Sequence, residues 1–198
     1  MSRLAASFVL GYHGCDAKIA RKLVNREDEI RPSGKKYDWL GPGAYFWEAD
    51  PRRAFEWAED TAERGKIETP AVVGAVIDLG NCLDLLAREN IELVREAHRL
   101  FLDEQKRSGL PIPENRSLDG EPDRILRFLD RAVIQFLHEI FDEADAAFDT
   151  VRGLFPEGEE LFPGAGIHDR NHIQIAVRKP GSILGLFYAP HYPPPHNA

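Results

Sequence analysis

Ala71-Val72-Val73-Gly74-Ala75-Val76-Ile77-Asp78-Leu79 is the clearest strand in the sequence, because it is nearly continuous in apolar residues. A strand that is covered on both faces has this pattern, whereas a strand with one solvated face alternates between apolar and polar residues. We therefore expect this segment to be a buried strand with both of its faces covered.

Further strand signals lie towards the two ends of the chain. Residues 7–14 predict a strand that stops at a glycine, and residues 44–47 predict a short aromatic strand. In the C-terminal part, residues 172–177 alternate, residues 182–188 predict a last strand, and residues 152–158 predict a turn-rich segment. The sequence thus indicates two strand-rich halves.

Two short helices accompany the first strands. Asp16 is a suitable N-cap for a helix that ends near Val24, and Asp50 with Pro51 fits an N-cap followed by a first helical position. Between these helices, residues 31–43 contain glycines and prolines that predict a loop with forced turns. The expected inner face of the second helix consists of Ala54, Trp57, Ala58 and Thr61.

The middle of the chain has a helical period instead. Residues 83–105 and 123–141 carry apolar faces at helical spacing, and the loop at 109–122 is rich in proline and glycine. We therefore expect an α-helical insertion over about residues 83–148 between the two strand-rich halves. Its acidic end, residues 139–149, is predicted to be a solvated helical face.

The length fits one domain over residues 1–198, and the strand-rich halves with a helical insertion fit the α+β class. The tail at 190–198 contains four prolines and is expected to be irregular. The formal net charge of −8 lacks the bulk basic footprint of nucleic-acid-binding proteins. Cys15 and Cys82 lack the spacing of a thiolate metal site and fit a reducing compartment. We expect a cytoplasmic protein without membrane contact, because the chain starts without a signal peptide and has no run of about 18 apolar residues.

Three segments carry side chains that suit chemistry. Tyr12-His13-Gly14-Cys15 places an imidazole beside a glycine, whose backbone a ligand can approach closely. Residues 38–48 join a Gly-Pro-Gly turn to aromatic residues, which can form a flat wall for a planar ring. A strand at 172–177 places three side chains on one face, those of His172, Gln174 and Ala176. Taken singly, the segments also fit a strand-end histidine, an aromatic mini-core and a solvent-facing polar stripe.

Taken in order, the segments resemble the signature motifs of the ADP-ribosyltransferase superfamily, in the histidine–tyrosine–glutamate group that includes poly(ADP-ribose) polymerase catalytic domains. His13-Gly14 resembles the first motif, His-Gly-Ser/Thr, and Gly41-Pro42-Gly43-Ala44-Tyr45-Phe46 resembles the second, Gly-x-Gly-Ile-Tyr-Phe. Asn171-His172-Ile173-Gln174-Ile175-Ala176-Val177 is similar to the third, Asn-Glu-Tyr-Ile-Val, with Gln174 at the glutamate position. The resemblance covers roughly residues 7–80 and 150–188.

This resemblance implies an ADP-ribosyltransferase-like split mixed β-sheet that binds NAD in a cleft. His13 would bond the adenosine ribose, and the Gly14 backbone would pair with the nicotinamide carboxamide. Tyr45 would stack on the nicotinamide ring, and Gln174 would touch a hydroxyl of the nicotinamide ribose. Catalysis would then depend on His13, Tyr45 and Gln174.

Further NAD-binding positions follow from the same resemblance. Gly43 belongs to the second motif, and Phe55 or Trp57 would replace a second stacking tyrosine that the chain lacks. The loop Ser33-Gly34-Lys35-Lys36 lacks the Gly-x4-Gly-Lys pattern of a P-loop. Two interpretations of this loop stay open: it covers the NAD diphosphate, with Lys35 or Lys36 pairing the phosphate charge, or it is a flexible solvated loop.

The chain also departs from the family pattern. Cys15 stands where Ser or Thr is usual, and Arg53 stands where a serine is frequent. At the third motif, the neutral amide of Gln174 can bond a ribose hydroxyl but cannot act as a base or offset a full positive charge. We therefore do not expect polymer formation. A carboxylate could come from the loop before the last strands, at Glu157, Glu159 or Glu160.

The function predicted first is NAD-dependent mono-ADP-ribosyl transfer to an unidentified protein or nucleic acid, with an antitoxin or another protein partner binding through the helical insertion. The alternatives are NAD hydrolysis, as in some toxins, and a catalytically silent module that binds NAD, ADP-ribose or a protein. A thiol nucleophile at Cys15 would lack a third, orienting group. A metal site at His168, Asp169 and His172 would lack a recognised ligand spacing, so no metal is expected.

Overall fold

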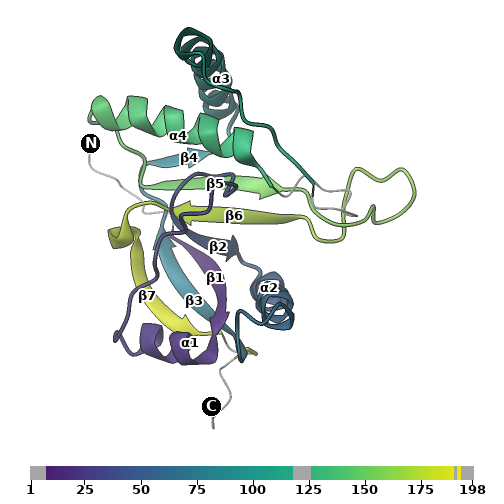
Figure 1. The fold of residues 1–198 in the computed structure, drawn as a ribbon. Helices are drawn as coiled ribbons and strands as arrows, with labels where there is room; N and C mark the ends of the chain where they lie inside the picture. Colours follow the sequence, from purple (N-terminus) through teal and green to yellow (C-terminus); the bar gives the residue numbers. More distant parts are fainter. Residues whose placement is uncertain (1–7, 118–125, 190, 193–198) are drawn as a thin grey trace.

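The computed structural model describes residues 8–117, 126–189 and 191–192 (Figure 1). Within these residues, seven strands form one mixed sheet in the order β4-β5-β6-β2-β1-β3-β7, and four α-helices pack on it. The expected α+β class with a mixed sheet is confirmed. No helix in the described ranges has both the length and the apolar character to cross a membrane. Most of the expected irregular tail at 190–198 lies outside the described residues.

The N-terminal half is built around β3 (Pro70–Asp78), the strand that the apolar run predicts. β1 (Phe8–Asp16) pairs antiparallel with β3 along its whole length, and β7 (Ile183–Tyr188) pairs with the other edge of β3. The side chains of β3 are accordingly fully buried over most of its length. The remaining strand of this half, β2 (Ala44–Glu48), lies beside β1.

Helices α1 (Ala17–Val24) and α2 (Pro51–Glu63) cover opposite faces of β1 and β3, as Figure 1 shows. Both expected N-caps are confirmed, because Asp16 accepts a hydrogen bond from the Lys18 backbone and Asp50 accepts one from the Arg53 backbone. On α2, Ala54 and Ala58 are buried as expected, and Trp57 is half-buried.

Three further strands complete the sheet, and two of them differ from the sequence prediction. β6 (His172–Val177) was expected, but residues 152–158 do not form a turn-rich segment, because β5 (Thr150–Phe155) pairs antiparallel with β6. The helix expected from residue 83 is also wrong at its start, because β4 (Cys82–Asp84) pairs parallel with β5. In both places long-range strand pairing overrides the local residue signals.

The helical insertion consists of α3 (Arg88–Ser108) and α4 (Phe128–Glu143). Both helices share a core with residues of β4, β5 and β6 and with Tyr45 of β2. In Figure 1, α4 lies next to β4 and β5, and α3 lies beyond α4. The buried residues between these helices and the sheet form a core that we call the second core, to distinguish it from the core around β3. It contains ten residues: Leu40, Leu83, Ala97, Phe101, Val133, Ile134, Leu137, Phe148, Val151 and Ala176.

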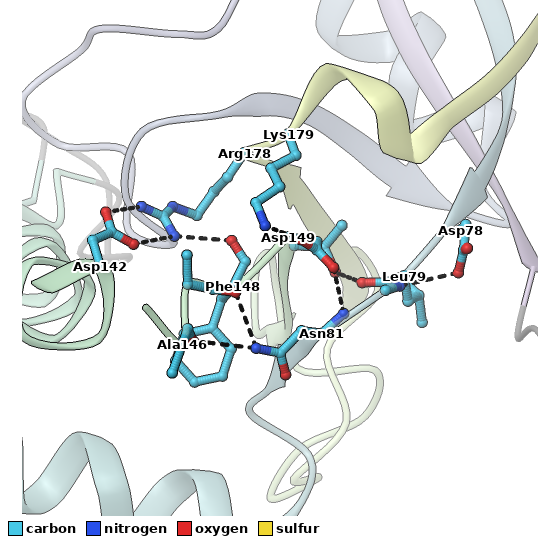
Figure 2. Close-up of polar contacts among 12 residues, drawn as sticks. Asp78, Leu79, Asn81, Asp142, Ala146, Phe148, Asp149, Arg178 and Lys179 are labelled. Atoms are coloured by element: carbon cyan, nitrogen blue, oxygen red, sulfur yellow. Dashed lines mark hydrogen bonds and ion pairs between the residues drawn. The ribbon is translucent and has the colours of Figure 1, made fainter. Parts of the chain in front are cut away.

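The acidic end of the insertion is not simply a solvated helical face. Asp142, near the end of α4, forms an ion pair of 2.9 Å with Arg178, which also donates to the Phe148 carbonyl. Asp149 pairs with Lys179 at 2.6 Å and accepts a hydrogen bond from the Asn81 backbone (Figure 2). These contacts attach the end of α4 to the chain that follows β6.

His138 on α4 is the most unusual residue of the second core. It is fully buried next to Phe148, and neither of its ring nitrogens has a hydrogen-bond partner among the described residues. Burial lowers the pKa of His138 to about 3, and the charge of Arg178 adds to this effect while that of Asp142 opposes it. The imidazole is therefore neutral in the folded protein at pH 7.

We predict that His138→Leu reduces the acid sensitivity of the fold. The unfolded chain protonates His138 near pH 6.5 and the folded chain only near pH 3, so this residue removes stability as the pH falls between these values. At about 1.4 kcal/mol per pH unit, the loss reaches about 3 kcal/mol by pH 4. Chemical denaturation at pH 7 and pH 4 measures it, and an equal loss in the leucine variant would contradict the prediction.

Candidate functional site

β1 and β2 pair as neighbours over two residue pairs, and their backbones then separate. Beyond this point β1 continues along β3, while β2 continues along β6. Where the backbone pairing between β1 and β2 ends, a side-chain hydrogen bond joins the two strands: His13 Nδ1 lies 2.9 Å from the carbonyl oxygen of Tyr45. The two register pairs are Gly11↔Glu48 and Tyr12↔Trp47.

This strand junction, which we define as His13, Gly14 and Tyr45, fixes the chemistry of the His13 ring. A carbonyl oxygen only accepts hydrogen bonds, so Nδ1 carries the proton and Nε2 presents a lone pair. Burial lowers the pKa of His13, the bond to Tyr45 opposes this effect, and the charge of Lys35 adds to it. His13 is therefore a neutral histidine with an acceptor at Nε2.

The other expected NAD-binding residues also lie in contact as pairs. Trp57 packs on Gly14 so closely that a Cβ at Gly14 would lie 3.1 Å from the Trp57 ring and 2.2 Å from the Ala54 carbonyl oxygen. The Ser33 backbone donates to the Gly43 carbonyl at 2.8 Å, which ties the expected diphosphate loop to the second motif.

The predicted catalytic side chains lie on two faces of the sheet. His13 and Phe46 share one face, where their ring centroids are 5.8 Å apart. Side chains alternate along a strand, so Tyr45 and Trp47 point to the other face. Gln174 is the register partner of Trp47 and shares that face. The structure therefore places Tyr45 and Gln174 on one face and the His13 ring on the other, and His13 is connected to Tyr45 only through the Tyr45 backbone.

The Tyr45 hydroxyl anchors the turn that precedes β2. It accepts a hydrogen bond from the Leu40 backbone at 3.0 Å and donates one to the Gly41 carbonyl at 2.9 Å. Burial raises the pKa of Tyr45, and the nearby charge of Asp38 raises it further, so the phenol stays neutral. What Tyr45 can offer a ligand is therefore its ring rather than an ionised oxygen.

Gln174 is held on both sides by ring nitrogens. Its Oε1 accepts from Trp39 Nε1 at 2.7 Å, and its Nε2 lies 2.8 Å from His172 Nε2. His172 Nδ1 donates to the Arg170 carbonyl at 2.7 Å, which leaves His172 Nε2 as the acceptor for the Gln174 amide. Because His172 is buried, the stripe of His172 and Gln174 does not face solvent.

An ion pair lies beside His172, at the ring nitrogen that Gln174 does not contact. Arg53 and Glu157 pair at 2.7 Å, and their side chains are only 9% and 16% exposed. The second carboxylate oxygen of Glu157 is 3.5 Å from His172 Nδ1, and the Arg53 guanidinium lies 5.7 Å from the Trp47 ring centroid. Of the three glutamates expected as alternative carboxylates, Glu157 is thus the one that approaches the third motif.

The helical insertion reaches the site through two arginines that the sequence did not single out. Arg127 lies 4.7 Å from the ring centroid of Phe155 and 6.0 Å from that of Trp39. Arg131 Nε donates to the Lys35 carbonyl at 3.0 Å. Trp39 stands beside the Gly-Pro-Gly turn and so carried a sequence signal, whereas neither arginine belongs to any motif.

Comparison with known proteins identifies no family or relative of this chain. Comparison of the chain with models of protein families, with curated proteins and with solved structures finds no match. The functional argument therefore depends on the motif residues and on the contacts that they make.

Two alternative chemistries lack support at these residues. Burial raises the pKa of Cys15 to about 12, and the Asp16 charge adds to this effect, so the thiol is protonated and a poor nucleophile at neutral pH. For a metal site, His168 Nδ1 already contacts the Gly158 carbonyl, and His172 is engaged by Gln174. In the described part of the chain, no three His, Cys, Asp or Glu side chains are grouped to hold a metal ion.

We predict that Gly14→Ala destabilises the protein, because the new Cβ would lie 2.2 Å from the α2 backbone at Ala54. Overpacking of this kind costs about 1–3 kcal/mol, which corresponds to a fall of roughly 2–12 °C in the melting temperature of a chain of this length. Gly34→Ala is the matched control, since its Cβ position has no described atom within 4 Å. Equal melting temperatures of the two variants would contradict the contact.

Proposed function

We propose that the protein is an NAD-dependent mono-ADP-ribosyltransferase that modifies a protein or nucleic acid. The observation that carries the proposal is the hydrogen bond from His13 Nδ1 to the Tyr45 carbonyl. It joins the first two motif segments at the place where β1 and β2 separate. A dinucleotide that touches both His13 and Gln174 must lie between β1 and β2, beyond the point where these two strands stop pairing with each other.

The protonation state of His13 supports this role. A ribose hydroxyl needs an acceptor for its proton, and the lone pair on His13 Nε2 supplies one. Because burial lowers the pKa of His13, the ring keeps this lone pair at neutral pH.

The hydrogen-bonding capacity of Gln174 also supports it. A carboxamide has two acceptor positions and two donors, and Trp39 and His172 take one of each. One oxygen lone pair and one N–H therefore remain for a ribose hydroxyl. The Trp39 and His172 contacts hold the amide in a fixed orientation, which favours interaction with charge that develops on the sugar.

In the proposed reaction, the bond between the nicotinamide nitrogen and C1 of the ribose breaks, and its electron pair leaves with nicotinamide. A nucleophile of the acceptor forms a bond to C1 and releases its proton to solvent. The aromatic ring of Tyr45 favours the cationic pyridinium before this step. The products are nicotinamide and an acceptor that carries one ADP-ribosyl group.

A second candidate is a catalytically silent module that binds NAD or ADP-ribose. The observation that favours it is the neutral amide at Gln174, together with the Glu157 carboxylate near His172, which Arg53 already neutralises. Such a module would keep the contacts of His13 without the charge that accelerates bond cleavage.

Incubation of the protein with NAD labelled in the adenine, together with cell extract as acceptor, tests the proposal. We expect free nicotinamide and labelled macromolecules, and we expect His13→Gln to lose both activities. This variant can keep an N–H bond to Tyr45 but lacks the imidazole Nε2 acceptor. His98→Ala on α3 is the control. Nicotinamide release without labelling would indicate hydrolysis, and NAD binding without release would indicate the silent module.

We predict that Gln174→Glu increases the rate of nicotinamide release by about 10²–10³-fold, because a carboxylate at this position offsets the positive charge of the sugar. The new carboxylate would face the lone pair of His172 Nε2, and protonation of this imidazole would pair with the carboxylate and neutralise its charge. The gain should therefore be larger at pH 8 than at pH 6. A pH–rate profile checks this, and a variant no faster than wild type at pH 8 would argue against a role for Gln174 in bond cleavage.

A further inference from the structure

Lys35 extends from the expected diphosphate loop to two aromatic rings. Its Nζ lies 5.6 Å from the ring centroid of Trp57 and 5.9 Å from that of Tyr37. Both distances are within the range of about 6 Å in which an ammonium is attracted to an aromatic face. The hydrogen bond from Arg131 to the Lys35 carbonyl holds the backbone of this residue against α4.

The ring that Lys35 contacts is part of the candidate NAD site. Trp57 packs on Gly14, whose backbone is expected to bind the nicotinamide carboxamide. The charge of Lys35 also contributes to the lowered pKa of His13, after burial and against the effect of the Tyr45 bond. The ammonium thus lies over Trp57, the residue that packs on the Gly14 backbone at which NAD is predicted to bind.

We infer that the Lys35 ammonium occupies the cation-binding face of Trp57 and competes there with the pyridinium ring of NAD. This inference rests on the proposed function, because that function places a nicotinamide ring beside Gly14 and Trp57. Both groups are cations that are attracted to an aromatic face, and they repel each other at the same face. Binding of the dinucleotide then requires Lys35 to leave Trp57.

This role is the opposite of the one that the sequence suggests for the loop. A lysine that pairs with the diphosphate strengthens NAD binding, so its removal weakens it. A lysine that competes for Trp57 weakens the binding of the pyridinium ring, so its removal strengthens it. A probe that has the cationic ring but no phosphate separates these two effects.

The probe is 1-methylnicotinamide, which carries the pyridinium charge, with neutral nicotinamide as its matched control. Titrations followed by NMR compare wild type, Lys35→Gln and Lys35→Arg. We expect Lys35→Gln to bind 1-methylnicotinamide about two- to five-fold more tightly, the size of an exposed cation–π contact. Lys35→Arg should remain close to wild type, and affinity for nicotinamide should change less than affinity for the cation.

Two further variants assign the effect to the contact. Lys36→Gln removes the same charge from an exposed position of the same loop, whereas the aromatic contacts described for this loop are those of Lys35. It should not strengthen binding of the probe. Adding Trp57→Leu to Lys35→Gln should remove the gain. An affinity of Lys35→Gln that is equal to or weaker than wild type, or no binding of 1-methylnicotinamide to either protein, would overturn the inference.

Failure of the proposed function gives a different result. If Lys35→Gln gains affinity for 1-methylnicotinamide while wild type neither binds NAD nor releases nicotinamide, the cation site stands and the transferase proposal fails. If wild type releases nicotinamide from NAD but Lys35→Gln shows no gain for the probe, the transferase proposal stands and the competition fails.

Discussion

The hydrogen bond from the His13 ring to the Tyr45 carbonyl holds two strands together at the place where their backbones stop pairing. A carbonyl left without a partner in the protein interior costs about 1–3 kcal/mol, and this bond gives the partly buried Tyr45 carbonyl a partner where the strands separate. The same bond places the proton on Nδ1 and leaves Nε2 as an acceptor. One interaction therefore sets both the shape of the junction and the chemistry that His13 can offer a ligand.

The loop before β2 contacts the candidate site on the face of the sheet opposite to the His13 ring. Trp39 of this loop donates a hydrogen bond to the Gln174 amide oxygen, and the backbone of Leu40 and Gly41 bonds the Tyr45 hydroxyl. The insertion contacts this loop at two points. The Arg127 guanidinium lies near the Trp39 ring, and Arg131 donates a hydrogen bond to the Lys35 carbonyl. α4 is therefore part of the architecture of the candidate site, although its sequence resembles no motif.

Features set by neighbouring residues were predictable from the sequence. The apolar run of β3, the cap at Asp16 and the alternation of β6 need no information from distant parts of the chain. β4 and β5 were missed or misassigned because their partners lie far away in the sequence. The contacts of Arg53 with Glu157 and of Lys35 with Trp57 also join distant segments, so the residue types alone could not predict which residues pair.

Nitrogen-15 NMR of the histidine side chains, with the His13 signals assigned through His13→Gln, tests the central claim most directly. The account predicts a neutral His13 ring at pH 7 with its proton on Nδ1, and an Nε2 resonance that shifts when NAD is added. A ring protonated on Nε2, or an Nε2 resonance that does not move at millimolar NAD, would contradict it.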